Sequence, residues 1–291
     1  MKTLGFIGVG DMGNPMAKRL LLAGFTVTVY DVHKQALQNL IDMGAKKASH
    51  LKECVHNEAI IVMVANDKQV EDVVAGPEGI LEHSLPNKHP IVVVMSTVLP
   101  ETVRRLAKVC AERGVDVIDA PVSGMRVAAE QGSLTIMAGG STEAIQTVMP
   151  ALSAMGKNIY HLGDVGTGCV AKLVNNIMGL TNMFLVVEAL NLGMKNGLSV
   201  EMALSVIEKS SGSNFYTRNL KQMKNFYSDF SKEMPAVERL LNLSRKDLEC
   251  IHGLALASEQ DGPLLDGIVN AFKSFNSLYV MNEWQRLTKN I

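Results

Sequence analysis

The chain has 291 residues, of which 47% are hydrophobic and 20% are charged, so it can bury a large core and lacks the composition of a disordered protein. Its formal net charge of −1 gives no broad electrostatic attraction for nucleic acid or for anionic membranes. We therefore expect no nucleic-acid partner.

The four cysteines are scattered without a C-x-x-C pair, and the seven histidines show no metal-ligand spacing. The N-terminal segment runs directly into a glycine motif, so we expect no secretory signal, reduced thiols, a cytoplasmic location and no metal site. The most apolar stretch, residues 173–194, contains four asparagines and a glutamate, which argues against a membrane span.

A strand, a tight turn and a helix are predicted at the start of the chain. An apolar run over residues 3–8 meets three glycines, and a helical pattern follows as far as Gly24. In a dinucleotide-binding turn, Gly8 would permit the tight turn, Gly10 would let the backbone approach a pyrophosphate, and Gly13 would let the helix pack. A glycine turn of this kind can also serve packing alone.

The second apolar run ends in Asp31, which lies 23 residues after Gly8. A carboxylate at this position can accept hydrogen bonds from a ribose diol. This spacing favours dinucleotide binding over a simple turn, with Asp11 and Met12 in the same cofactor loop. Asp31 would repel a 2′-phosphate and no arginine follows it, so NAD is expected over NADP. His33 and Lys34 keep NADP open as an alternative.

Strand-like runs recur with helical segments between them, which predicts an α/β fold with a Rossmann-type, doubly wound and mostly parallel sheet. The runs are residues 59–64, 91–95, 115–118, 134–137 and 159–162.

Ligands of such sheets lie beyond the carboxyl ends of the strands, so the loops that follow these runs contain candidate binding groups. Ala65, Asn66, Ser96 and Thr97 are candidates for cofactor contact, and the loop at 121–124 is a further candidate. Serine, threonine and asparagine also cap helices, so capping stays open as the alternative for Asn66, Ser96 and Thr97.

Strand signals almost vanish after Gly166, and helical periodicity continues to Arg286, which places a domain boundary near residues 163–166. We expect a dinucleotide-binding domain over residues 1–163. We expect an all-helical domain for substrate binding and oligomerisation over residues 164–291, opened by a long interdomain helix. Its apolar composition predicts a homodimer or homotetramer.

That first long helix begins with a polar stripe. Lys172, Asn175, Asn176 and Gly179 fall at i, i+3, i+4 and i+7, so they share one helix face among apolar neighbours. Burial among apolar side chains disfavours the charged ammonium form, so it lowers the pKa of a lysine towards the range that is useful for proton transfer. Lys172 is therefore a candidate functional residue, and a snorkelling or salt-bridged lysine is the alternative.

Six separated motifs occur in an order that resembles the β-hydroxyacid dehydrogenase family, and the resemblance covers nearly the whole chain. They are Gly5–Met16, Met95–Val98, Asp119–Gly124, Gly132–Met137, Gly166–Gly168 followed by Lys172 and Asn176, and Lys246–Leu248.

The resemblance implies an NAD(P)-dependent oxidoreductase that transfers hydride between the nicotinamide and a small 3-hydroxy or 4-hydroxy carboxylic acid, or its semialdehyde or keto form. It implies that Lys172 is the catalytic acid and base, that Ser123 and the amide of Gly124 hold the substrate carboxylate, and that Asn176 orients the substrate. It also implies that Lys246 reaches the cofactor, although a solvated helix charge beside another basic residue is the alternative.

The chain departs from the family where Met125 replaces a usual glycine and Arg126 follows it. Both are candidate substrate-binding residues. The Arg126 guanidinium would either clamp a second carboxylate or face solvent.

Three alternatives remain at this point. An imine reductase can use the same scaffold, but relatives of that kind usually lack the lysine. A phosphogluconate-type decarboxylase has a larger helical domain than residues 164–291 can form. A non-catalytic dinucleotide-binding partner module belongs to a different class and would not require Lys172, Ser123 and Asn176 together.

Overall fold

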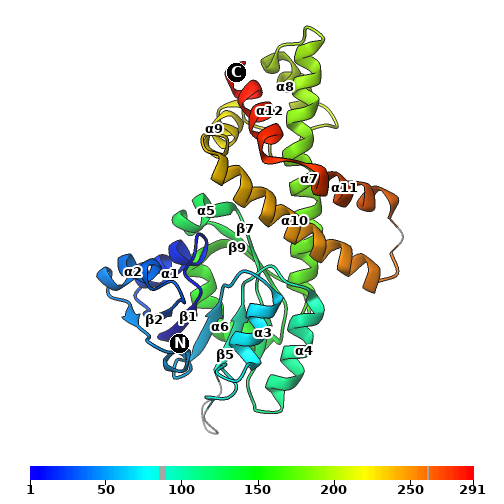
Figure 1. Ribbon diagram of the computed structural model, residues 1–291. Helices are drawn as coiled ribbons and strands as arrows, with labels where there is room; N and C mark the ends of the chain where they lie inside the picture. Colours follow the sequence, from blue (N-terminus) through cyan, green and yellow to red (C-terminus); the bar gives the residue numbers. More distant parts are fainter. Residues whose placement is uncertain (85–89, 261) are drawn as a thin grey trace. The chain divides into compact units, whose positions relative to one another are not determined.

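The computed structural model describes residues 1–84, 90–260 and 262–291. The chain divides into two compact units, Met1–Lys172 and Leu173–Ile291. The first combines strands and helices, and every element described in the second is a helix (Figure 1). An α/β Rossmann-type domain followed by an all-helical domain is confirmed.

The first unit contains a six-stranded, entirely parallel sheet in the order β3-β2-β1-β4-β5-β6. The chain builds outward from β1 to β3 and then returns to the other side of β1, so the strand order reverses between β1 and β4. In open α/β sheets, ligands bind beside such a switch point, at the carboxyl ends of the strands. The strands are β1 (Thr3–Ile7), β2 (Thr26–Tyr30), β3 (Lys46–Lys47), β4 (Ala59–Val62), β5 (Ile91–Val94) and β6 (Val117–Asp119).

Helices cover both faces of this sheet because its strands are apolar on both sides. In β4, Ile61 packs into one hydrophobic core while Ile60 and Val62 pack into the other. The first core includes side chains of α1 (Gly13–Leu22), α2 (Gln38–Asp42) and α6 (Thr142–Met155), and the second includes those of α3 (Asp67–Ala75) and α4 (Pro100–Ala111). Short 3-10 helices, η1 (Lys34–Leu37) and η2 (Leu51–Cys54), complete the region around β2 and β3.

Two strand-like runs expected in the main sheet belong instead to a second sheet in the order β7-β8-β9. They form β8 (Leu134–Ala138) and β9 (Gly156–His161), which pair in parallel, while β7 (Val122–Ser123) pairs antiparallel to β8. A backbone bridge between Asp119 and Gly139 links the end of the main sheet to this second sheet. An apolar run indicates a buried strand, but it does not identify the neighbour with which the strand pairs.

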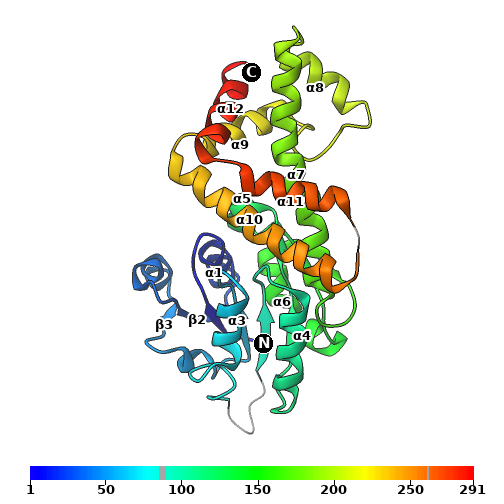
Figure 2. The ribbon, with the colours of Figure 1, turned by 45° about the vertical axis from the view of Figure 1, so that its right-hand side comes forward.

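The helical unit begins within α7 (Thr167–Lys195), a continuous helix of 29 residues whose first turns belong to the first unit (Figure 2). Side-chain caps from Ser199, Asn219 and Asn276 begin three of the following helices, and prolines stand at the start of two others. These helices are α8 (Val200–Glu208), α9 (Leu220–Phe230), α10 (Met234–Ala257), α11 (Pro263–Ser274) and α12 (Ser277–Lys289).

The core of the helical unit is aromatic. The ring of Trp284 lies 5.0 Å from that of Tyr227 and 5.4 Å from that of Phe184, and the Tyr227 hydroxyl donates to the Met183 carbonyl at 2.7 Å. All four side chains are buried, and the tyrosine hydroxyl has found the partner that a buried polar group needs. By length and hydropathy, α7 is the one described helix that could cross a membrane, a test that core helices of soluble proteins also pass.

Candidate active site

The glycine-rich loop after β1 is shaped by close backbone contacts. Gly8 has φ +90°, and a Cβ added there would lie 2.2 Å from the Met63 carbonyl oxygen. A Cβ added to Gly13 would lie 2.0 Å from the Gly8 carbonyl oxygen, so α1 can begin this close to the turn only with glycine. For Gly10, apart from the residue itself and its two chain neighbours, no heavy atom of the described residues lies within 4 Å of an added Cβ, so the loop faces open space at this residue.

The amino end of α1 points into the same region. Its N-cap residue, Met12, makes no side-chain capping bond, and no acidic residue of the described chain stands in the first helical turn. The helix therefore presents its positive dipole end, which suits a phosphate, although the Asn14 amide already donates to the Gly10 carbonyl at 3.0 Å and Pro15 has no N–H. Asp11 is exposed in this loop.

Asp31 joins the tip of β2 to the glycine-rich loop. One carboxylate oxygen accepts a hydrogen bond from the Val9 amide, and the other accepts one from the His33 amide, both at 2.8 Å. Each oxygen keeps a further lone pair, so the carboxylate can also accept from the hydroxyls of a ribose.

The side chains at the tips of β4 and β5 are engaged by the fold. The buried Ser96 hydroxyl donates to the Val64 carbonyl and accepts from the Val64 amide, both at 2.8 Å, which ties the two tips together. Asn66 caps α3 by accepting from the Gln69 amide at 2.9 Å, and the Ala65 amide donates to the Gln69 side chain at 2.9 Å. Asn66 therefore caps a helix and Ser96 bridges two loops, while both stay candidates for cofactor contact.

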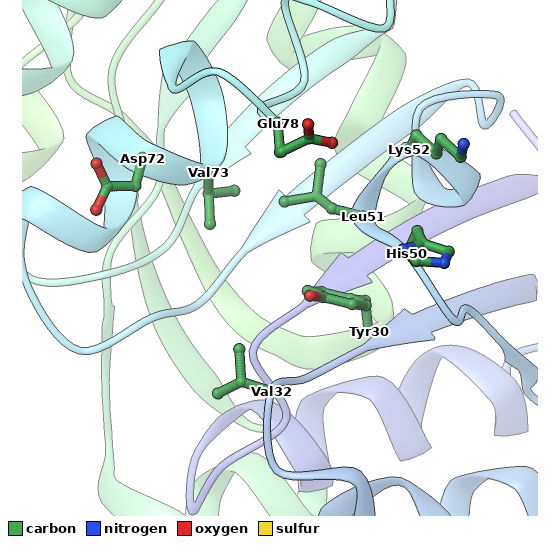
Figure 3. A pocket seen from close by; sticks show the side chains of 8 residues that line it. All are labelled: Tyr30, Val32, His50, Leu51, Lys52, Asp72, Val73 and Glu78. Atoms are coloured by element: carbon green, nitrogen blue, oxygen red, sulfur yellow. The ribbon is translucent and has the colours of Figure 1, made fainter.

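A cavity of about 320 Å³ opens beside the tip of β2 (Figure 3). Tyr30 and Val32, the two neighbours of Asp31, line it together with apolar side chains from η2 and α3. Basic side chains lie on one side and acidic ones on another. Dinucleotide-binding folds hold the adenosine half of the cofactor at this end of the second strand. The other lining residues are His50, Leu51, Lys52, Asp72, Val73 and Glu78.

The loop after β7 enters α5 (Met125–Gln131) through two residues with positive φ. Gly124 has φ +130° and Met125 has φ +59°, so a methionine occupies the left-handed region that glycine adopts without strain. Ser123, which precedes them, is half-buried. Arg126 is exposed and its Nε donates to Glu130 at 2.8 Å, so its charge is already paired along α5.

The start of α7 is attached to the end of β6 by a buried carboxylate. The Gly166 amide donates to Asp119 Oδ1 and the Cys169 amide donates to Asp119 Oδ2, both at 2.6 Å. Burial raises the pKa of Asp119, and the two amides act in the opposite direction. Lys172 follows one helical turn later and is only 9% exposed.

In the helical unit, Asp247 brings together two residues predicted from sequence. Asn176 Nδ2 donates to Asp247 Oδ2 at 2.7 Å, and Lys246 Nζ lies 2.9 Å from Asp247 Oδ1. Oδ1 has no hydrogen-bond partner of good geometry among the described residues, so its interaction with Lys246 is electrostatic. Asn176 and Asp247 are buried, whereas Asn175 is exposed.

The thiols take no part in a reactive cluster. All four cysteines lie in the described part of the chain, are buried and form no disulfide, and burial raises the pKa of Cys54 and of Cys110 to about 12. Within residues 1–84, 90–260 and 262–291, no three His, Cys, Asp or Glu side chains gather as a group that could hold a metal ion.

Comparison with known proteins covers both units. Residues 3–163 match a family model described as the NAD binding domain of 6-phosphogluconate dehydrogenase, and residues 166–279 match "NAD-binding of NADP-dependent 3-hydroxyisobutyrate dehydrogenase". A 2-(hydroxymethyl)glutarate dehydrogenase from Eubacterium barkeri is 40% identical over 89% of this chain and 83% of its own length. The chain belongs to the β-hydroxyacid dehydrogenase family. It is an NAD(P)-dependent dehydrogenase that acts on hydroxy acids.

A second relative of this β-hydroxyacid dehydrogenase, the 3-hydroxyisobutyrate dehydrogenase of Pseudomonas aeruginosa, is 36% identical over 89% of this chain and 86% of its own. The structure of the Mycobacterium tuberculosis 3-hydroxyisobutyrate dehydrogenase with L-serine has a TM-score of 0.82 at 24% identity, covering 97% of this chain and 98% of its own. Psf3 in complex with NADP+ and 2-OPP has a TM-score of 0.83 at 25% identity, covering 98% and 99%.

Imine reductases share the fold at a greater distance. The Myxococcus stipitatus enzyme in complex with NAD+ has a TM-score of 0.65 at 17% identity, covering 98% of this chain and 99% of its own. This likeness concerns the fold alone.

The residues of the first unit fit the dinucleotide that this β-hydroxyacid dehydrogenase binds. The open space at Gly10 and the uncapped amino end of α1 suit the phosphates, and the Asp31 carboxylate stands where the ribose hydroxyls would need an acceptor.

Two buried carboxylates, Asp119 and Asp247, were not singled out as site residues from sequence. Asp119 closes a buried strand and precedes the 121–124 loop, and Asp247 follows Lys246, so both lay inside motifs that had been noticed. An aspartate in an apolar strand is a signal that could have found the first. The second had no local signal, because its partner Asn176 is 71 residues away in sequence.

Proposed function

We propose that Lys172 moves the hydroxyl proton in this dehydrogenase, as general acid during reduction and general base during oxidation. The observation that supports this most directly is its burial on α7, one turn after a segment fixed to the carboxyl end of β6. A lysine is costly to bury, and this one is the last residue of the first compact unit.

The proposed division of roles follows from the chemistry of each group. When bound, NAD(P) takes up or delivers the hydride at the substrate carbon. The neutral amine of Lys172 accepts the hydroxyl proton during oxidation, and its ammonium returns that proton during reduction. Ser123 and the Gly124 amide hold the substrate carboxylate, and Asn176 orients the substrate.

The remaining cofactor contacts are part of the same proposal. Gly8, Gly10, Asp11, Met12 and Gly13 surround the phosphates. Ala65, Asn66, Ser96 and Thr97 border the cofactor from the tips of β4 and β5, Asp31 favours NAD over NADP, and Lys246 reaches the cofactor.

We propose a small 3-hydroxy or 4-hydroxy carboxylic acid as substrate, with Met125 and Arg126 near its far end. Residues 1–163 would serve the dinucleotide, and residues 164–291 would serve substrate binding and assembly into a homodimer or homotetramer in the cytoplasm. The apolar side chains exposed along α7 support assembly, because monomeric proteins rarely leave large apolar surfaces uncovered.

Substitution of Lys172 by alanine tests the proton role. Loss of the acid and base should lower kcat by about 10²–10⁴-fold while the dissociation constant for NAD stays unchanged. The measurement is NADH formation at saturating hydroxy acid, with NAD binding followed by fluorescence. The matched control is Lys195→Ala, at the exposed end of the same helix, which should keep full turnover. Turnover of Lys172→Ala close to that of the wild type would rule out the proton role.

A substrate panel tests the class of acid. We expect oxidation of short 3-hydroxy or 4-hydroxy acids, with NAD used better than NADP, and no reduction of cyclic imines. In the same panel, Arg126→Ala should raise KM for dicarboxylic substrates far more than for monocarboxylic ones if the guanidinium leaves Glu130 to bind a second carboxylate. Equal effects on both classes would place Arg126 outside the substrate site.

A further inference from the structure

Asp119 lies where three elements meet. It ends β6, its backbone exchanges two hydrogen bonds with Gly139 of the segment after β8, and its carboxylate accepts two amides from the start of α7. The residue is fully buried. The main chain of Asp119 is therefore fixed by Gly139, and its side chain in turn fixes the backbone at the start of α7.

Glycines allow α7 to begin this close to the carboxylate. A Cβ added to Gly168 would lie 2.9 Å from Asp119 Oδ2 and 2.2 Å from the Met137 carbonyl oxygen. A Cβ added to Gly139 would lie 2.7 Å from Asp119 Oδ1. Gly166 has φ +95°, which turns its amide towards the carboxylate, and this conformation is strained for other residues. The Gly166–Gly168 motif is thus explained by its approach to Asp119.

The two bonds fix both the position and the rotation of the helix. One amide lies just before α7 and the other lies in its first turn, so neither end of that turn can move without breaking a short, charge-assisted bond. The first amides of a helix have no partner within the helix, and a carboxylate there also suits its dipole. Lys172 is three residues beyond Cys169, one turn along nearly the same helix face.

We propose that Asp119 is the positioning residue for Lys172: it sets where α7 leaves the sheet and which way the lysine points. This inference rests on the proposed proton role of Lys172. A carboxylate is costly to bury, as the raised pKa of Asp119 indicates, and a purely apolar joint would avoid that cost. The carboxylate fixes the position of the start of α7, because it accepts hydrogen bonds from two amides at once and an apolar side chain could accept none.

Asp119→Asn tests the proposal with the smallest change of shape. An amide side chain has one acceptor oxygen, so it can hold one backbone N–H and must oppose the other with its own NH₂. A shift of about 1 Å at a reacting group can cost 10²-fold in rate, so kcat should fall about 10- to 100-fold. The dissociation constant for NAD should stay within about 2-fold of wild type. Ile118→Val is the control, because it removes a buried methyl group from the same strand and leaves both bonds in place.

A matched pair of glycine substitutions tests the same contact between Asp119 and the start of α7, and it does so whether or not Asp119→Asn folds well. Gly166→Ala strains a backbone that donates to Asp119, and the atoms nearest to its added Cβ belong to the Arg104 side chain, with Nε at 2.7 Å and Cγ at 3.1 Å. Gly163→Ala strains a backbone of similar φ, +120°, whose added Cβ meets nothing nearer than 3.6 Å and whose amide is not bonded to Asp119. Gly166→Ala should lower kcat several-fold more than Gly163→Ala at equal loss of Tm.

The outcomes separate this inference from the proton role. If Lys172→Ala abolishes turnover while Asp119→Asn keeps kcat within 2-fold of Ile118→Val, the positioning role is wrong and the proton role stands. If Lys172→Ala turns over normally, the proton role itself is wrong. Equal losses of kcat in Gly166→Ala and Gly163→Ala, or a loss of NAD affinity in Asp119→Asn as large as its loss of kcat, would also overturn the positioning role.

Discussion

Asn176 Nδ2 donates a 2.7 Å hydrogen bond to Asp247 Oδ2, and both side chains are buried. The bond joins α7 to α10 within the helical unit, and the other oxygen of Asp247 pairs with Lys246. Asp247 thus holds Asn176, which is proposed to orient the substrate, and Lys246, which is proposed to reach the cofactor. Asp247 itself is not proposed to contact either ligand.

Asn176→Ala should lower the free energy of unfolding by about 1.5–3 kcal/mol, because a buried carboxylate loses a hydrogen bond that water cannot fully replace. In an Asp247→Ala background the same substitution should cost much less, since the acceptor is already gone. Urea unfolding of the two single variants and the double variant measures this coupling.

The control for this cycle is Asn196→Ala, exposed just after the end of α7, where the side chain donates to the Leu192 carbonyl. A change of no more than about 0.5 kcal/mol is expected there. Additive effects of Asn176→Ala and Asp247→Ala would show that the bond contributes nothing to stability.

Met125 provides a second prediction because its backbone lies in the left-handed region at φ +59°. A non-glycine residue there carries a strain of about 1–2 kcal/mol, whereas glycine adopts the conformation freely but loses about 0.5–1 kcal/mol in backbone entropy on folding. Met125→Gly should therefore raise the free energy of unfolding by roughly 0.5–1 kcal/mol, as measured by urea unfolding.

Val127→Gly is the matched control, since it lies two residues later on the same helix and is also exposed. There, glycine relieves no strain and should destabilise by about 0.5–1 kcal/mol. If both substitutions destabilise equally, the strain at Met125 is too small to matter. Methionine in place of the family's usual glycine should therefore lower the free energy of unfolding by a measurable amount.

Local features of the fold were predictable from sequence because they depend on local chemistry. Gly8 and Gly13 lie where their spacing predicted the turn and the helix start, and the strand that ends before Asp31 lies where the second apolar run predicted it. The helical half was predictable from its periodicity between Gly197, Gly212 and Gly262, each of which lies between two helices.

Strand pairing, the shortest strands and the backbone conformation at Met125 were not predictable from local sequence in the same way. The run that forms β8 reads as a buried strand in either sheet, and only its pairing with β7 and β9 decides its place. The two residues of β3 and of β7 are too few to show an alternating pattern. The positive φ of Met125 contradicts the preference of its own side chain, and the family's usual glycine at this position was the sequence signal for it.

The faces of α7 do not follow the usual rule that apolar side chains are buried and polar ones exposed. Lys172 and Asn176 are buried, whereas apolar side chains of the same helix are exposed: Val174 at 58%, Met178 at 64%, Leu185 at 53% and Leu192 at 64%. Three of these follow one another at seven-residue intervals, and Val174 stands four before the first, so together they form one stripe along the helix. This α7 stripe needs a covering surface, and a second copy of the chain is the proposed occupant.

Introducing charge into the α7 stripe should therefore dissociate the oligomer. The double variant Leu185→Glu/Leu192→Glu should shift the mass in solution from dimer or tetramer to monomer, because a carboxylate at the centre of an apolar contact loses hydration without gaining a partner. Sedimentation over a range of concentrations measures the mass. Leu264→Glu on α11 is the control, since that side chain is 77% exposed outside the α7 stripe and its charge should leave the mass unchanged. A wild-type chain that sediments as a monomer at every concentration, or a double variant that keeps the wild-type mass, would show that the stripe is not the contact between copies.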